Sequence, residues 1–468
     1  MDGNIGTLKK GFPSGMVSAM VDLSSIPMPP AYVWTILFYL VVIAVIYRYR
    51  KRFEWHGIVG LYRTKFGVKA MSSFGKPSDG EGAGNLLLNL TFPLVVASLL
   101  LLIPHAQRWI VLPDEVVSAA LIVFIISTIV YLLTILFLRP LKLAGVHAII
   151  IGFLGMVLIT AMLVKGLYDL AFVPSAPPVI SPVIPGVPIL GMGITVPLVI
   201  GWLALFLVIL VHEFSHGIVA RAHNLPVKAS GLMVFGPLGG AFVEPDEEKL
   251  KKSSRKTQLS VFAAGPFSNV LLAIVSWFVV MLLLVPLLSA FIASDGVVFE
   301  KVTKGYPAAA AGVTPGIVYD RVNNVTVSTY ADFSATLEGL APNDTVVLES
   351  SRSERAHVIV ATSHPENASR GYLGVIQGVN LKEQSYRPLY DVLYWFVELF
   401  TWTFLLSLGI GLANLLPLGP VDGGRMLQVV SEKWFGEKVG KSIWTKITII
   451  VIVVLAILLI VPFLKAIF

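Results

Sequence analysis

The segment LFLVILVHEFSH, residues 205–216, carries two histidines and a glutamate at the end of an uncharged apolar run. On a helix, His212 and His216 lie one turn apart on the same face, close enough to bind one metal ion, and the HExxH pattern is typical of zinc sites. Glu213 then lies beside the metal, where it can take a proton from water. Ionisable side chains are costly to bury at membrane depth, which favours a functional role. The alternative is a pair of helical histidines that makes only polar contacts.

The composition is that of a membrane protein. Of the 468 residues, 56% are hydrophobic and 13% are charged, and the mean hydropathy is +0.81. A soluble protein cannot bury so much apolar surface, so we expect a polytopic α-helical membrane protein. The chain has no cysteine, so a zinc ion would need histidine and carboxylate ligands. The net charge of +7 comes from basic residues in loops beside apolar runs, which indicates membrane topology rather than nucleic-acid binding.

Eight apolar runs are each long enough to cross a bilayer as a helix. They lie near residues 31–48, 86–104, 115–138, 146–172, 196–222, 258–291, 389–416 and 443–464. Lys and Arg are concentrated in the loops after the first and fifth runs and before the last run, so these loops are expected in the cytoplasm. Both termini and residues 292–388 are then expected outside, with the HExxH segment near the cytoplasmic side. The first 30 residues show no pattern of a removable signal peptide.

Residues 224–248 contain short β-like stretches around glycines, directly after the HExxH run. Non-helical backbone near a membrane is tolerated where protein or a water-filled cavity supports it. Gly239 and Gly240 are therefore candidates for an edge strand that pairs with an extended substrate peptide. The alternative is an ordinary cytoplasmic hairpin.

Residues 292–388 are more polar and predict a small α/β domain, with several short strands and helices at 307–311 and 330–340. The segment resembles a PDZ domain through GYPAA at 305–309, AGVTPG at 311–316 and VNN at 322–324. PDZ domains bind extended peptides by strand addition. The resemblance implies a loop that faces the peptide carboxylate, formed by Tyr372, Leu373, Gly374 and Val375. The alternative is a rigid spacer that limits access to the membrane core.

An HExxH site requires a third protein ligand, and Asp422 is the candidate. It lies in NLLPLGPVDGG, residues 414–424, on the same predicted side of the membrane as the two histidines. Two prolines and a glycine pair break the helix there, so the carboxylate can turn inward. Glu398, within the seventh run, is a rival ligand without a supporting motif. The alternative for Asp422 is a turn-forming residue before Gly-Gly.

Three motifs together resemble those of the site-2 protease family of intramembrane zinc metalloproteases. They are HEFSH at 212–216, GPFSN at 265–269 and NLLPLGPVDGG at 414–424. The resemblance implies cleavage of transmembrane segments by a Zn²⁺ site, with Glu213 as the catalytic base. The implied zinc ligands are His212, His216 and Asp422.

Two asparagines also receive roles from this resemblance. Asn414 is implied to steady the developing oxyanion, and Asn269 is implied to lie near the cleft that receives the substrate. For Asn414 the alternative is an amide that bonds a neighbouring helix. For Gly265 and Asn269 it is close packing of membrane helices.

The expected organisation is an N-terminal extension with about four transmembrane helices, two halves of a protease core and the inserted PDZ-like domain. The corresponding residues are 1–172, 173–291 with 389–468, and 292–388. We expect an intramembrane zinc endopeptidase in a prokaryotic plasma membrane. Its expected partners are the lipid bilayer, membrane-protein substrates and a peptide ligand of the PDZ-like domain, but no nucleic acid. Alternatives are a membrane HExxH protease of another clan that acts on soluble peptides, a non-catalytic PDZ adaptor and, more weakly, a zinc transporter.

Overall fold

The computed structural model describes residues 30–65, 67–74, 80–106, 109–173, 178, 180–189, 194–352, 355–365 and 367–467. Within these residues, eight helices are long and apolar enough to cross a membrane, as predicted for a polytopic helical membrane protein. Large apolar side chains cover their outer faces; Leu100 is 69% exposed and Val157 is 69% exposed. Such surfaces are suited to lipid rather than water. The expectation about a signal peptide concerns residues that lie outside the described part.

The helices follow the predicted apolar runs closely. The long ones are α2 (Pro30–Tyr49), α4 (Glu81–Ala106), α5 (Asp114–Leu133), α6 (Leu141–Phe172), α7 (Leu198–Ala222), α9 (Arg255–Phe278), α13 (Arg387–Asn414) and α15 (Glu437–Ile467). The overlong run near 258–291 continues from α9 through a π-helical segment, Val279–Leu284, into α10 (Val285–Ser289). A second π-helical segment, Thr134–Leu138, follows α5. The shorter helices are η2 (Arg50–Arg52), α3 (Val68–Phe74), α8 (Glu247–Lys252), η5 (Gln384–Tyr386) and α14 (Asp422–Phe435).

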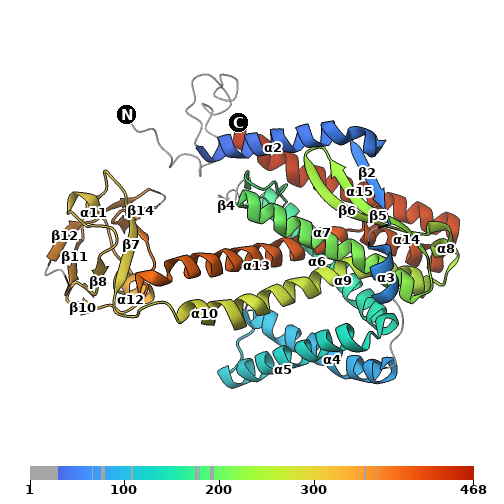
Figure 1. Cartoon of the computed structure of the whole chain (residues 1–468), viewed down its shortest axis with the longest axis horizontal. Helices are drawn as coiled ribbons and strands as arrows, with labels where there is room; N and C mark the ends of the chain where they lie inside the picture. The colour runs from blue at the N-terminus through green and yellow to red at the C-terminus, as the bar shows by residue number, and fades with distance from the viewer. Residues whose placement is uncertain are drawn as a thin grey trace. The chain divides into compact units, whose positions relative to one another are not determined.

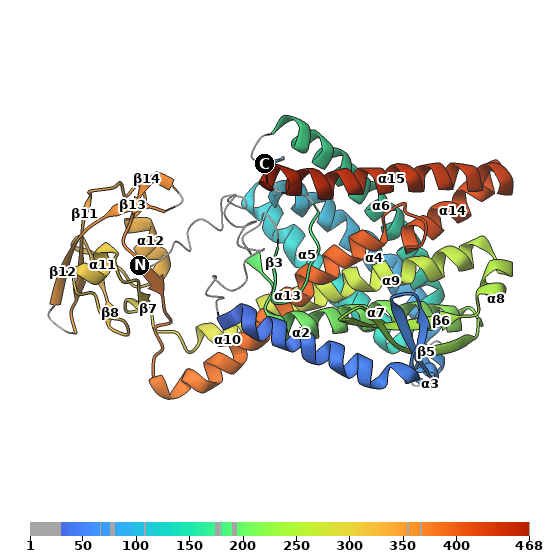
Figure 2. The ribbon, with the colours of Figure 1, turned by 90° about the horizontal axis from the view of Figure 1, so that it is seen from above.

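The described chain divides into two compact units, of which the larger comprises residues 30–277 and 399–467. Figure 1 shows α4 beside α5 in this unit, and Figure 2 shows α6 next to α14 and α15. One core cluster joins side chains of α4, α5 and α6 to side chains of α9 and α14. It includes Leu88, Tyr131, Met156, Phe267 and Met426. Helices α4, α5 and α6 of the predicted N-terminal extension therefore share a core with the helices that carry the motifs.

An antiparallel sheet lies beside α7 in the larger unit (Figure 2). Its strands are ordered β1-β2-β5-β6, with bounds Glu54–His56, Val59–Thr64, Val227–Phe235 and Leu238–Pro245. The turn between β5 and β6 requires φ of +56° at Gly236, a conformation that favours glycine. Among the described residues no further strand pairs with β6, so residues 227–245 form a hairpin whose second strand lies at the edge of the sheet. Pairing of this edge with a substrate stays a prediction. The pairing of β1 and β2 with this hairpin was not predicted. A second hairpin joins β3 (Pro188–Ile189) to β4 (Ile194–Thr195).

The smaller unit comprises residues 278–398 and contains the predicted α/β segment. Its sheets have the orders β10-β9-β11-β12, β15-β7-β8 and β13-β14, and its helices are α11 (Pro307–Ala310) and α12 (Tyr330–Thr336). The strands are β7 (Val297–Val302), β8 (Val318–Tyr319), β9 (Arg321–Val322), β10 (Val325–Thr326), β11 (Thr345–Ser350), β12 (Arg355–Val360), β13 (Thr362–His364), β14 (Asn367–Tyr372) and β15 (Val375–Gln377). Phe299, Tyr319 and Leu348 are fully buried in its core. The predicted strands and helices are present, whereas the PDZ assignment stays a prediction.

Candidate metal centre

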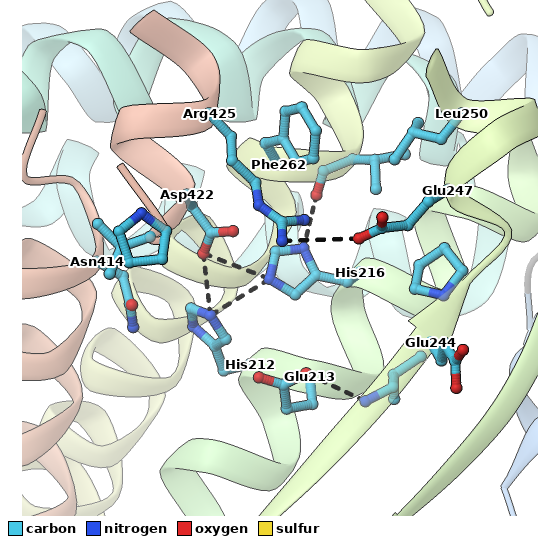
Figure 3. A pocket seen from close by; sticks show the side chains of 15 residues that line it. His212, Glu213, His216, Glu244, Glu247, Leu250, Phe262, Asn414, Asp422 and Arg425 are labelled. Carbon is cyan, nitrogen blue, oxygen red and sulfur yellow. Dashed lines mark hydrogen bonds and ion pairs between the residues drawn. The ribbon is translucent and has the colours of Figure 1, made fainter. Parts of the chain in front are cut away.

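Three side chains from two helices converge at one point in the larger unit (Figure 3). His212 and His216 lie one turn apart on α7, and Asp422 is the first residue of α14. The Nε2 atom of His212 lies 3.1 Å from Asp422 Oδ2 and 3.3 Å from His216 Nε2, and His216 Nε2 lies 3.4 Å from Asp422 Oδ2. Ligand atoms at about 2.05 Å from a tetrahedral metal ion lie about 3.3 Å apart. The triangle therefore has the size of one face of such a site.

The orientation of His216 is fixed by a backbone carbonyl. Its Nδ1–H donates to the carbonyl oxygen of Val261, on α9, at 2.7 Å. This bond holds the ring proton on Nδ1, so the neutral imidazole turns the lone pair of Nε2 toward His212 and Asp422. That is the tautomer and the direction that a metal ligand needs.

Asn269 on α9 holds the other histidine. Its fully buried side-chain amide lies 3.2 Å from His212 Nδ1, and the amide oxygen has no hydrogen-bond partner as the side chain is oriented. Rotating the amide by half a turn lets this oxygen accept the Nδ1 proton, which leaves His212 Nε2 free for a metal. The hydroxyl of Ser407 donates to the Asn269 backbone carbonyl at 2.8 Å and so ties α13 to α9.

In their deprotonated states the three converging atoms repel one another, and either a proton on a histidine Nε2 that donates to Asp422 or a metal ion between them relieves this repulsion. Two nitrogen lone pairs and a carboxylate oxygen face each other, and the side chains of His212, His216 and Asp422 are 7%, 12% and 13% exposed. Water therefore screens their repulsion only weakly. The donor set of two imidazoles and one carboxylate, with room for a fourth ligand, is that of a catalytic metal site.

Gly265 supplies the room for this centre. A Cβ atom at this position would lie 2.6 Å from both Cε1 and Nε2 of His212 and closer still to Nε2 of His216. Any side chain here would fill the space between the two ligand nitrogens. The close approach of α9 to α7 therefore depends on glycine.

The two glycines after Asp422 serve a similar purpose with backbone partners. A Cβ at Gly423 would overlap the carbonyl of Leu415, and one at Gly424 would overlap the carbonyl of Leu418. The start of α14 can therefore lie directly against the turn that follows α13. This contact brings Asp422 toward α7, as the prolines and glycines of the segment predicted.

The metal triangle opens into a cavity of about 300 Å³, lined by Glu213, Val243, Asn414 and Arg425 among others. The Glu213 carboxylate accepts a hydrogen bond of 3.2 Å from the backbone N–H of Val243, on β6. Arg425 lies 3.7 Å from Glu247 and over the ring of Phe262, and it lines the same cavity as His216 (Figure 3). The cavity thus holds a carboxylate, an amide and a guanidinium around the three converging atoms.

A model of peptidase family M50 matches residues 200–459, which is more than half of the chain and includes α7, α9, α13 and α14. The chain belongs to peptidase family M50. The members of this family are membrane metalloproteases, and the resemblance to site-2 proteases is thereby confirmed. The chain is also 27% identical over 232 residues to an uncharacterised protein of Methanocaldococcus jannaschii, a match that covers 49% of this chain and 57% of the relative's length.

The structure brings together most of the site residues predicted from the M50 motifs. Asn414 and Glu213 line the cavity, and Asn269 touches His212 from behind. Gly239 and Gly240 lie on β6, where added Cβ atoms would approach Trp202 and Ile209 of α7, and they do not line the cavity. The described residues form one group of three potential ligands, and its carboxylate is Asp422.

The predicted carboxylate-facing loop lies in the smaller unit, described by itself. Tyr372, Leu373, Gly374 and Val375 line one side of a groove of about 630 Å³, and α12 lines the other side. Gly374 has φ of +83°, and a Cβ there would overlap Tyr306, so the loop needs glycine at this point. The groove thus has one wall formed by α12 and another formed by the ends of β14 and β15 with the loop between them.

Three contributors to the M50 centre were not predicted. Val261 acts through its carbonyl, which any residue type provides, so no sequence signal could have revealed it. Ser407 acts through a hydrogen bond to a backbone atom, with the same result. Arg425 directly follows the glycine pair, and its position in that motif was the one available signal.

Proposed function

We propose that this chain is a zinc endopeptidase that cleaves transmembrane segments of membrane proteins. His212, His216 and Asp422 hold Zn²⁺, which as a Lewis acid polarises the scissile carbonyl and lowers the pKa of water. The observation that carries the proposal is the triangle of three buried acceptor atoms around the space left by Gly265. A metal ion of tetrahedral preference explains both the spacing of the atoms and the glycine.

Two side chains of the cavity carry the remaining chemistry. Glu213 takes the proton of the attacking water and returns it to the leaving amine, because it directly follows His212 on α7 and lines the same cavity. The side-chain amide of Asn414 donates to the oxyanion that develops on the scissile carbonyl. Its place at the end of α13, in the wall of the cavity, supports this role.

The free edge of β6 supports an extended substrate. The N–H of Val243 points away from β5, because it donates to Glu213. Backbone groups alternate in direction along a strand, so those of Ala241 and Gly239 point the same way. A substrate strand paired with Gly239 and Ala241 would lead toward Val243 and the catalytic base. Pairing of this kind compensates for the helical hydrogen bonds that a transmembrane segment loses when it unwinds.

Topology and the smaller unit complete the proposal. The Lys and Arg distribution favours a cytoplasmic position for the catalytic cavity and an outer position for residues 292–388. The groove between α12 and the Tyr372–Val375 loop is suited to an extended peptide end. The protein acts in the plasma membrane of a prokaryote, with the bilayer and membrane-protein substrates as its partners.

The test separates metal binding from proteolysis in the purified full-length chain. Glu213→Gln keeps the three ligands, so we expect zinc at the wild-type stoichiometry and cleavage of a transmembrane substrate lowered at least ~10²-fold. Glu248→Gln, on the exposed face of α8, is the matched control and keeps full activity. Wild-type rates with Glu213→Gln would overturn the assignment of the base.

The same experiment distinguishes the alternatives. A protease of another clan with a glutamate as third ligand would keep its zinc after Asp422→Ala, whereas the proposed centre loses it. A peptide-binding adaptor would show no proteolysis that depends on Glu213. A transporter would move zinc across the membrane of vesicles. It would cleave no substrate, so the wild type and Glu213→Gln would show the same background signal in the proteolysis assay.

A further inference from the structure

Helix α6 packs against α14, which carries the third metal ligand, and against α9, which lines the ligand nitrogens. A Cβ at Gly152 would lie 2.8 Å from Cε and 3.3 Å from Sδ of Met426, and 3.5 Å from Cβ of Ala263. Met426 is fully buried one turn after Asp422 on α14, and Ala263 is fully buried two residues before Gly265 on α9. One residue of α6 therefore touches both the helix of the third ligand and the helix that lines the ligand nitrogens.

Two other contacts of α6 lie one residue away from groups of the centre. A Cβ at Gly155 would overlap the side chain of Leu415, which is 2% exposed and directly follows Asn414. A Cβ at Gly145 would lie 2.9 Å from Cβ of Ser260, which precedes Val261. Through these neighbours α6 contacts the segments that hold the oxyanion amide and the carbonyl bonded to His216.

The opposite side of α6 is held by the other helices of the N-terminal segment. His147 is 4% exposed, and its Nδ1 lies 3.0 Å from the hydroxyl of Tyr131 on α5. Phe92 of α4 stacks on its ring at 4.0 Å with an interplanar angle of 6°. Because α6 is packed on this side as well, a larger side chain at Gly152 meets the flexible end of Met426 first. Met426 is fully buried, so a side chain as large as valine is expected to press on α14 through it.

We propose that Gly152 is a positioning residue of the metal centre, through which α6 sets the place of Asp422 relative to the two histidines. Asp422 and the histidines come from segments far apart in the chain, so their spacing depends on helices that contact both. The N-terminal helices are then part of the catalytic scaffold rather than a separate appendage. The inference rests on the proposed metal site.

The test is a volume exchange at one contact in the full-length protein. Gly152→Val adds as many side-chain heavy atoms as Met426→Ala removes, so the double variant restores the packed volume. Gly82→Val, where a Cβ meets nothing within 4 Å, is the control for a β-branched residue in a helix of the same segment. Zinc affinity is measured by competition with a chelator, and thermal unfolding is followed with and without zinc.

We expect Gly152→Val to weaken zinc binding about 10-fold or more, the size of effect typical of groups that orient metal ligands. The double variant should regain most of that loss, and Gly82→Val should bind zinc as the wild type does. If Gly152→Val lowers only the stability of the zinc-free protein and keeps the zinc affinity, Gly152 serves helix packing alone and the inference is wrong. Failure of the wild type itself to bind zinc would instead reject the proposed function.

Discussion

Replacing Gly265 with alanine tests the metal centre with the addition of one methyl group. The new Cβ would lie 2.6 Å from Nε2 of His212, where ordinary van der Waals contact begins at 3.4 Å. Relief requires a displacement of about 0.8 Å, several times the ~0.2 Å by which ligand distances in a functional metal site vary. His216 Nε2 is closer still, so both nitrogens have to move.

The backbone effects of the variant oppose each other. Alanine is more favourable than glycine inside a helix by about 1 kcal/mol, whereas residue 265 precedes Pro266 within α9, where a Cβ is disfavoured in the helical conformation. The loss is therefore expected in metal binding. Changes in groups that only orient metal ligands lower affinity 10–100-fold, and a direct overlap with two ligands should exceed about 100-fold on the same scale.

The assay is the zinc content of the protein purified in detergent, followed by titration with a chelator. Gly409→Ala is the matched control, because it lies in α13 and a Cβ there meets nothing within 4 Å. We expect Gly409→Ala to bind zinc normally and Gly265→Ala to be folded but free of metal. Stoichiometric zinc of unchanged affinity in Gly265→Ala would refute the reasoning about the space between the histidines.

Three further predictions concern substrate, topology and pH. Ala241→Pro removes one outward N–H from β6, and losing one hydrogen bond of ~1 kcal/mol should lower kcat/KM for a transmembrane substrate about fivefold. Zinc should be retained, and an unchanged kcat/KM would argue against strand pairing. A cysteine at Ser363 should be labelled in intact cells and one at Ser73 only after permeabilisation, and the reverse pattern would invert the topology. The pKa of Asp332 lies below 3.8 mainly because the backbone N–H of Thr329 donates a hydrogen bond to its carboxylate. The hydroxyl of Thr329 and the backbone N–H of Ser328 donate to the same carboxylate and lower the pKa further. The stabilisation of α12 by this carboxylate is thus complete above pH 3.8 and is lost as the pH falls through the lowered pKa. The protection of α12 amides against hydrogen exchange, relative to the intrinsic rate at each pH, should therefore fall there, and Asp332→Asn should remove the dependence.

The sequence revealed the parts of the fold that are governed by local patterns. A long apolar run has few alternatives to a membrane helix, so α7 and α13 were predicted within a few residues of their bounds. The β5–β6 hairpin was recognisable from its glycines. By contrast, β1 and β2 are short, and their pairing with β5 joins residues about 170 positions apart. No local pattern encodes such a partner, since strand pairing depends on burial and neighbours.

The metal ligands were recognisable because their side chains themselves carry the chemistry. The groups that orient them were harder to find, since Val261 contributes a carbonyl oxygen and Ser407 bonds to a backbone atom. Asn269 was predicted to lie near the cleft, whereas the structure shows it against the outer nitrogen of His212. A side-chain amide can hydrogen-bond either to a substrate or to the outer nitrogen of a metal-binding histidine, and the sequence does not distinguish these two roles.

The glycines of the centre show how local disadvantage marks a functional site. Gly265 lies inside α9, and Gly423 and Gly424 lie in the first turn of α14, whereas glycine is less favourable than alanine by up to about 1 kcal/mol in a helix interior. Two of them admit a backbone carbonyl and the third admits two imidazoles, so a side chain at any of them would separate the segments that form the site. Helical glycines without a nearby atom, such as Gly82 and Gly409, carry no such constraint. A glycine in a predicted helix therefore indicates a functional site when a segment that carries metal ligands has to approach it closely. Here this close approach brings α7, α9 and α14 together in one metal centre.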